Sequence, residues 1–373
     1  MTINDLSGSI NSAHAFFGYD AGGWRVDKHV RLLADTTGDK RLDIVGFGET
    51  GVWISRNNGD STFEQPKMVV NDFAYAAGGW RVEQHLRFMA DIRNTGRADI
   101  VGFGNNGVLV SLNNGDGTFA PPKLASRSFG YRVAAGGWRV DKHLRFLADV
   151  NGNGLLDIVG FGEQHVYIAV NNGDGTFQPT KEVLAEFCYD KSWRVPEHPR
   201  FVVDMTGDGK PDLVGFADDG VYIAFNNGDG TFRSAHKVSD GFCRNKGGWI
   251  AEKSYPRVIA DLTGNGCGDI IGFGEAGYVG INNGNGTFQG SKLALAEFGF
   301  TGGWRLGVHP RFVVDLTGNG KADIIGFGNA GIHVAYNDGN GGFRTGSRLI
   351  EGFGFDGGWL SDKTIRLVAN IYR

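Results

Sequence analysis

Cysteine is scarce in this chain. The 373 residues contain only three, Cys188, Cys243 and Cys267, and so small and odd a number argues against a disulfide framework. Long apolar stretches are missing as well: no run of about 18 apolar residues occurs, so the sequence predicts no membrane insertion. The N-terminus has neither a basic start nor an apolar centre. We therefore expect no signal peptide and a protein that is cytoplasmic or released without one.

Strong charge of either sign is also absent. The formal net charge is −4 at pH 7, which excludes a basic nucleic-acid-binding protein. The sequence shows no nucleophile motif and no single set of acid, base and nucleophile of the kind that enzymes gather in one place. It therefore predicts a protein that is not an enzyme and has no nucleic-acid partner.

Glycine, by contrast, is abundant. There are 62 glycines, and aromatic residues make up 12% of the chain. Glycine at more than twice its usual share of about 7% indicates many tight turns, and the aromatic content excludes a flexible linker. The combination is typical of many short strands joined by turns.

One phrase, glycine-glycine-tryptophan or a near variant, recurs along the chain. It ends at Trp24, Trp80, Trp138, Trp193, Trp249, Trp304 and Trp359, at spacings of 55 to 58 residues. Each repeat holds four short runs rich in β-branched and aromatic residues, bounded by Gly, Asn and Asp. Four strands per unit of about 56 residues are the signature of a β-propeller blade. We therefore predict an all-β fold in which residues 1–373 form a single β-propeller domain.

The number of blades follows from the same count. The second and third strand runs and the loop NNGDGTF or a near variant occur six times, which predicts six complete four-stranded blades. The glycine-glycine-tryptophan phrase occurs seven times, because residues 1–23 resemble a stray outer strand and residues 357–373 a stray inner strand. The alternative is seven blades, the seventh reduced and formed by the two termini.

The phrase continues as GGWR-x-x-x-H, and its place in the repeat is the crossover from one blade to the next, on one rim of the propeller. Arginine and histidine follow the tryptophan in five copies and are lost together in two, where Ile250 and Leu360 replace the arginine. Loss of the pair while the fold signals persist indicates a binding site. An aromatic ring, a guanidinium and an imidazole suit a neutral polyhydroxylated ligand such as a sugar.

The tryptophan alone also has a structural interpretation, as a wedge between blades. With the aromatic residues that precede the crossovers, the predicted sugar-binding residues are Trp24, Arg25, His29, Trp80, Arg81, His85, Trp138, Arg139, His143, Trp193, Arg194, His198, Trp304, Arg305, His309, Tyr19, Tyr75, Tyr131 and Tyr189. One site per intact copy predicts five sites. A polar residue in the turn on the same face is a further candidate, at Glu49, Asn105, Glu163, Asp218, Glu275 and Asn329.

A second arginine is present in all seven copies, at Arg31, Arg87, Arg145, Arg200, Arg257, Arg311 and Arg366. Because it survives where the arginine–histidine pair is lost, we interpret it as structural, and we expect it to pair with a nearby carboxylate.

The opposite rim carries polar loops such as DVNGNGLLD. Oxygen side chains around a glycine can bind Ca²⁺, but Asp and Asn also make such turns through bonds to the backbone. The best candidate metal ligands are Asp149, Asn151, Asn153, Asp157, Asp204, Asp208 and Asp212. We expect that no cofactor is required, that structural Ca²⁺ is the alternative, and that calcium is dispensable for sugar binding.

These residues carry a family resemblance. The loop D-x-x-G-[DN]-G-x-x-D followed by DIVGFG resembles the FG-GAP repeats of integrin-type propellers. With GGWR-x-x-x-H added, the chain from about Phe17 onward resembles the mushroom β-propeller lectins, the family of the Psathyrella velutina lectin and the Agrocybe aegerita N-acetylglucosamine-binding lectin.

The resemblance implies a multivalent lectin that recognises terminal non-reducing N-acetylglucosamine in clefts between adjacent blades, without catalysis. Its partners would be glycans and glycoproteins that end in this sugar. Two alternatives stay open: an FG-GAP-like protein-interaction scaffold, and a lectin for another sugar such as fucose or galactose. The near-identical rim loops favour one small ligand bound several times over a single asymmetric partner surface.

Overall fold

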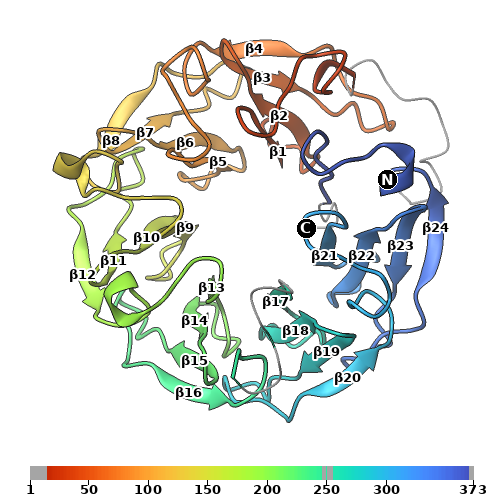
Figure 1. The fold of residues 1–373 in the computed structure, drawn as a ribbon. Coiled ribbons are helices and arrows are strands. Elements are labelled where there is room, and N and C mark those ends of the chain that lie inside the picture. The colour runs from red at the N-terminus through yellow and green to blue at the C-terminus, as the bar shows by residue number, and fades with distance from the viewer. Residues whose placement is uncertain (1–14, 246–248, 250–254, 369–373) are drawn as a thin grey trace.

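The computed structural model describes residues 15–245, 249 and 255–368. Its strands form six four-stranded antiparallel sheets, and in each sheet the strands lie side by side in sequence order. The six sheets stand as blades around a common centre, with the first strand of each blade innermost (Figure 1). The prediction of an all-β propeller with six complete blades is confirmed.

The strands are short and occur at the predicted places. Blades 1 to 3 contain β1 (Val30–Ala34), β2 (Asp43–Phe47), β3 (Val52–Ser55), β4 (Lys67–Val70), β5 (Arg87–Ala90), β6 (Asp99–Phe103), β7 (Val108–Ser111), β8 (Lys123–Ser126), β9 (Leu144–Ala148), β10 (Asp157–Phe161), β11 (Val166–Ala169) and β12 (Lys181–Leu184). Blades 4 to 6 contain β13 (Arg200–Val203), β14 (Asp212–Phe216), β15 (Val221–Ala224), β16 (His236–Ser239), β17 (Arg257–Ala260), β18 (Asp269–Phe273), β19 (Gly277–Gly280), β20 (Lys292–Leu295), β21 (Arg311–Val314), β22 (Asp323–Phe327), β23 (Gly331–Ala335) and β24 (Ser347–Glu351).

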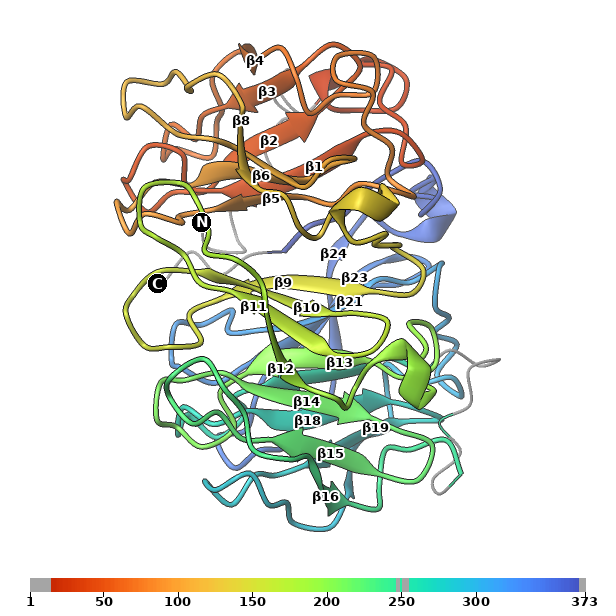
Figure 2. The same ribbon diagram turned by 90° about the vertical axis from the view of Figure 1, so that its left-hand side faces the viewer.

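In the described parts of the crossovers lie the single turns of 3-10 helix η2 (Val133–Ala135), η3 (Tyr189–Lys191) and η5 (Phe355–Gly357). Seen from the side in Figure 2, these turns lie on one face of the disc. Residues 15–29 and 352–368 contain no strand, so the described parts of the two ends build no seventh sheet. Within the described ranges, no helix is long and apolar enough to cross a membrane.

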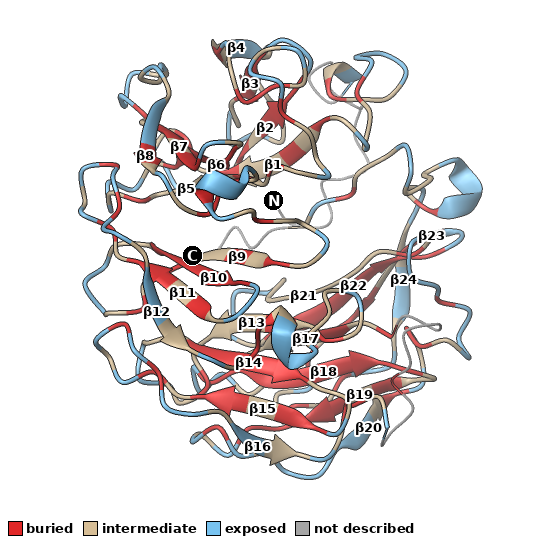
Figure 3. Cartoon of the chain, turned by 60° about the vertical axis from the view of Figure 1, so that its left-hand side comes forward, coloured by how far each residue is buried: buried red, intermediate tan, exposed pale blue. Residues whose placement is uncertain are grey.

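The hydrophobic core lies between neighbouring blades. Val45 and Phe47 of blade 1 pack in one cluster with Trp80 and Ile100 of the next repeat. The second strand of each blade is the most deeply buried, and in β10 all five residues are buried. The outermost strands begin with exposed residues such as Lys181 in β12, and this gradient from buried to exposed is visible in Figure 3.

The loop NNGDGTF links each of blades 2 to 6 to the blade before it. The first asparagine of the loop in blade 2, Asn113, donates from Nδ2 to the carbonyl of Thr36 in blade 1 at 2.9 Å. Blades 3 to 6 repeat this bond, from Asn171, Asn226, Asn282 and Asn337 to Ile92, Val150, Met205 and Leu262. A buried amide that spans two blades must keep its partners, which explains why the loop recurs with so little change.

Candidate functional site

The crossover tryptophans fill space inside the fold. Trp138 is 5% exposed, and its ring lies directly against Gly160 of β10, where an added Cβ would come within 2.4 Å of it. Trp24, Trp80 and Trp304 are buried in the same way, and Trp193 is partly exposed but lies against Gly215. Burial of these rings favours the structural interpretation of the tryptophans as wedges between blades. Their role as sugar-binding residues stays a prediction.

The crossover arginine stacks on the aromatic residue of its own crossover. The Arg81 guanidinium carbon lies 3.8 Å from the ring centroid of Tyr75, and Nη1 donates to the carbonyls of Tyr75 and Trp80 at 2.8 and 3.0 Å. The copies at Arg25, Arg139, Arg194 and Arg305 repeat both features, over Tyr19, Tyr131, Tyr189 and Phe300. In all five, Nε and Nη2 make no hydrogen bond to the residues that the structure describes, so this side of the guanidinium offers two donors to a ligand.

A buried histidine fixes the polar residue of the neighbouring turn. His143 is 4% exposed, and its Nδ1 accepts a hydrogen bond from the backbone N–H of Arg139 at 3.1 Å. Because Nδ1 is an acceptor, the proton of the neutral ring lies on Nε2, which donates to Glu163 at 2.9 Å. Burial lowers the pKa of His143, which keeps this neutral form at pH 7.

Four further histidines make the same contact: His29 with Glu49, His85 with Asn105, His198 with Asp218, and His309 with Asn329, at 3.3, 3.2, 3.2 and 2.8 Å. The carboxylates are held in place but remain open to solvent, since the Glu49, Glu163 and Asp218 side chains are 53, 47 and 49% exposed. The turn residues, considered only as further candidates from the sequence, are thus the exposed hydrogen-bonding groups of the site.

The histidine of one crossover faces the aromatic residue of the next crossover. His85 and Tyr131 lie with ring centroids 6.0 Å apart, and the backbone N–H of Tyr131 donates to Gly104 beside Asn105. Each such group of facing residues, called a rim cleft below, therefore combines His and a turn residue from one repeat with an aromatic–arginine stack from the following repeat. The arginine and the histidine of one motif copy thus belong to adjacent clefts, and the number of occupied sites stays a prediction.

Three clefts are complete, and they contain His29–Glu49 with Tyr75–Arg81, His85–Asn105 with Tyr131–Arg139, and His143–Glu163 with Tyr189–Arg194. The cleft of blade 4 has Arg244 where the aromatic residue belongs, and Arg244 pairs with Glu197 at 3.3 Å. The arginine position that belongs to this cleft, Ile250, lies outside the described residues.

The last two clefts differ again. In blade 5, Tyr255 takes the place of the histidine and its hydroxyl donates to Glu275 at 2.5 Å, beside Phe300 and Arg305. In blade 6, His309 and Asn329 face Phe355, but Leu360 stands where the arginine would be. At the seam, Tyr19 and Arg25 face Lys363 with no histidine beside them in the described residues.

The substitution by Tyr255 was missed in the sequence. One signal could have found it, since each histidine precedes its turn residue by 20 positions and Tyr255 precedes Glu275 by the same 20. A phenol hydroxyl reaches the carboxylate that an imidazole N–H reaches elsewhere.

The second arginine of each repeat is structural but has no carboxylate partner among the described residues. Arg145 is 3% exposed and donates from Nη1 to the carbonyl of Phe129 at 3.4 Å. Burial lowers its pKa to about 10. The expected pairing with a carboxylate is wrong, because the guanidinium bonds a backbone carbonyl and lies near the rings of Phe103 and Trp138.

In the polar loops on the opposite rim, side-chain oxygens accept hydrogen bonds from backbone N–H groups. Asp149 accepts the N–H groups of Gly152, Asn153 and Gly154, and buried Asp157 accepts those of Val150 and Asn171. Asn151 and Asn153 each accept a backbone N–H within the turn. Burial raises the pKa of Asp157 to about 6, which a bound cation would oppose.

The blade 4 loop follows the same plan through Asp204, Asp208 and Asp212. No group of three His, Cys, Asp or Glu in the described parts of the chain is arranged to hold a metal ion. These hydrogen bonds favour a turn-forming role for the candidate ligands, and structural Ca²⁺ in the loops stays a prediction.

We predict a pH-dependent contribution of the cleft histidines to stability. Burial lowers the pKa of His85 in the folded state below the ordinary 6.5, so folding favours the neutral ring. Its contribution is therefore fully present above pH about 6.5 and is lost as pH falls through the folded-state pKa. The loss of melting temperature in His85→Ala, relative to wild type, should be largest at pH 7 to 8 and should shrink below about pH 5.

The comparison between the two proteins cancels the titration of buried Asp157 and Asp212, which acts in the opposite direction. A control variant is His236→Ala, because His236 is exposed on β16 and should give a small difference at every pH. A His85→Ala difference that grows on acidification would contradict the assigned proton positions.

Comparisons with known proteins identify the family and the fold. The family model for FG-GAP-like repeats matches residues 149–195 and 204–272. A solved structure titled as the structural basis of specific recognition of non-reducing terminal N-acetylglucosamine by an Agrocybe aegerita lectin is 56% identical, with a TM-score of 0.93 over 96% of this chain and 89% of that chain. The Tc holotoxin pore of Photorhabdus luminescens matches at 19% identity and a TM-score of 0.54, over 86% of this chain and 14% of that chain, which shows the fold alone. A search of curated proteins found no match.

Proposed function

Because this chain belongs to the family of β-propeller lectins that the Agrocybe aegerita lectin represents, we propose that its rim clefts bind terminal non-reducing N-acetylglucosamine. A lectin binds carbohydrate without transforming it, in keeping with the prediction that the protein is not an enzyme. The partners of the protein are then glycans and glycoproteins that present this sugar.

The observation that carries the proposal is that each complete cleft combines a hydrogen-bond acceptor, the turn residue, with two free donors, Nε and Nη2 of the arginine. Glu163 is fixed by buried His143, and its remaining lone pairs can accept hydrogen bonds from two neighbouring sugar hydroxyls. Nε and Nη2 of Arg194 can donate to the carbonyl of an N-acetyl group. This set of donors and acceptors matches a neutral amide-bearing sugar better than fucose or galactose, which have no amide.

Repetition of the cleft also bears on the partner. One small ligand bound several times explains why the rim keeps the same residues, whereas a protein partner would contact a single, asymmetric surface. A monosaccharide leaves much of itself in water, so each cleft is expected to bind weakly and clustered sugars much more tightly.

Titration calorimetry with free N-acetylglucosamine tests the function and counts the sites. We expect saturable binding with at least three and fewer than six sites per chain, because three clefts are complete and the blade 4 cleft is filled by Arg244. Glucose, which lacks the N-acetyl group, and fucose and galactose are the controls, and they should bind more weakly. No saturable binding of N-acetylglucosamine, or stronger binding of any control, would contradict the proposed function.

A further inference from the structure

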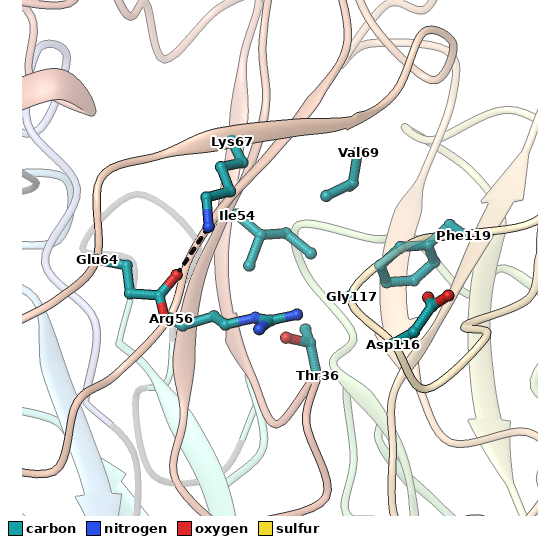
Figure 4. A pocket seen from close by; sticks show the side chains of 9 residues that line it. All are labelled: Thr36, Ile54, Arg56, Glu64, Lys67, Val69, Asp116, Gly117 and Phe119. Atoms are coloured by element: carbon teal, nitrogen blue, oxygen red, sulfur yellow. Dashed lines mark hydrogen bonds and ion pairs between the residues drawn. The ribbon is translucent and has the colours of Figure 1, made fainter.

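A cavity lies at the joint between blades 1 and 2. It measures about 150 Å³ and lies away from the rim clefts, between the end of β3, β4 and the NNGDGTF loop of blade 2. Figure 4 shows the residues that line it: Thr36, Ile54, Arg56, Glu64, Lys67, Val69, Asp116, Gly117 and Phe119. None of them belongs to the clefts described above.

The cavity lies beside one departure from the repeat. The residue before the first asparagine of NNGDGTF is apolar or aromatic in five blades, at Leu112, Val170, Phe225, Ile281 and Tyr336. Three of these pack under the loop of the next blade, as Leu112 does against Gly175. Blade 1 has Arg56 at this position, and its guanidinium lies against Gly117, the equivalent glycine, so a charged group takes the place of an apolar one.

The walls of the cavity divide into a charged part and an apolar part. The Arg56 side chain forms no hydrogen bond or ion pair with any residue that the structure describes. Asp116 bonds Thr118 through Oδ1 only, which leaves Oδ2 unused in the same part of the chain. Lys67 and Glu64 neutralise each other at 3.3 Å, and Ile54, Val69 and Phe119 supply the apolar surface.

The Arg56 guanidinium, the unused Asp116 oxygen and the apolar wall beside them indicate what kind of ligand the cavity can bind. An anion alone would leave Asp116 opposed to it, and a cation alone would leave Arg56 opposed to it. A molecule with both charges satisfies the two groups, and a cavity of about 150 Å³ admits an apolar group of about the size of benzene. We propose that this cavity binds a small zwitterion with an apolar side chain, of the size and charge of a free aliphatic α-amino acid.

In this arrangement the Arg56 guanidinium donates hydrogen bonds to the carboxylate of the ligand, and the ammonium donates to Oδ2 of Asp116. The side chain of the ligand packs on Ile54, Val69 and Phe119. The interaction is non-covalent and independent of sugar binding, since no residue of the cavity lies in a rim cleft.

The test is ligand-observed NMR and titration of the full chain with leucine. Two matched compounds each remove one charge: 4-methylpentanoate has no ammonium, and isopentylamine has no carboxylate. We expect saturable leucine binding that is at least about tenfold tighter than that of either compound, because each loses a charge-assisted hydrogen bond.

The variant Arg56→Leu introduces the residue that stands at Leu112 in blade 2, so it should fold. Because it removes the guanidinium, it should bind leucine at least about tenfold more weakly. Its N-acetylglucosamine titration should equal that of the wild type, which separates this proposal from the proposed function. The proposal is overturned if leucine does not saturate the wild type, if 4-methylpentanoate binds as tightly as leucine, or if folded Arg56→Leu binds leucine as tightly as the wild type.

Discussion

The triple variant Glu49→Ala, Asn105→Ala, Glu163→Ala will lose binding to a surface of clustered N-acetylglucosamine. Each substitution removes the exposed acceptor of one complete cleft, and a hydrogen bond with a charged group contributes about 1.5–3 kcal/mol, or roughly tenfold to a hundredfold in affinity. The loss is amplified on a dense surface, because the attachment of one sugar there raises the effective concentration for the next cleft.

The same turns offer a matched control. Thr50, Asn106 and Gln164 each follow one of these residues and are exposed, so their triple alanine variant changes the same turns without touching the histidine-bound position. The control variant should keep the wild-type melting temperature within a few degrees, since its altered side chains are solvent-exposed. The cleft variant should remain folded but melt somewhat lower, because three buried histidines lose a hydrogen-bond partner. Surface plasmon resonance on immobilised glycan is the measurement. Equal affinity of the two variants would show that the sugar lies elsewhere.

The fold could be predicted because its signals repeat. Six copies of a four-strand pattern average out the ambiguity of any single run, and the loop NNGDGTF marks each blade joint. Departures within the copies were harder to interpret. Nothing near Arg56 in the sequence shows that its position fills a joint, because the partner, Gly117, lies in the next blade.

The site could be predicted only in its parts. Arg139 and His143 are close in sequence, and a tight turn does bring the His143 ring back to the Arg139 backbone. The Arg139 guanidinium, however, extends to Tyr131 and the cleft of blade 2, whereas His143 faces Glu163 in the cleft of blade 3. The path of the backbone between blades decides which of the two neighbouring clefts a side chain enters. The order of residues in a motif does not give this path.

The burial of the tryptophan was open in the sequence for a related reason. Tryptophan suits both an exposed sugar-binding ring and a buried ring wedged between blades. The feature that decides between them is the glycine of the second strand, 22 residues after the tryptophan in blade 3. In the printed sequence that glycine is one of many. In the structure the Trp138 ring packs directly against it.

This contact between Trp138 and Gly160 is expected to give the largest loss of stability from single substitutions. Trp138→Ala removes a buried ring and should lower the free energy of unfolding by about 3–5 kcal/mol. Gly160→Ala should cost about 1–3 kcal/mol, because the new methyl group would lie 2.4 Å from the Trp138 ring and 2.7 Å from that of Phe129.

The two substitutions should not add. Once the Trp138 ring is absent, the alanine methyl at position 160 loses its closest contact and can shift from Phe129 into the vacated space. The double variant should therefore be about as stable as Trp138→Ala alone. Urea unfolding of the two single variants and the double variant measures the coupling, with Gly290→Ala as the control, since a Cβ at Gly290 meets no atom within 4 Å. Strict additivity, or a Gly160→Ala variant as stable as Gly290→Ala, would mean that the tryptophan does not rest on the glycine. The tryptophan would then again be available as a face for the sugar.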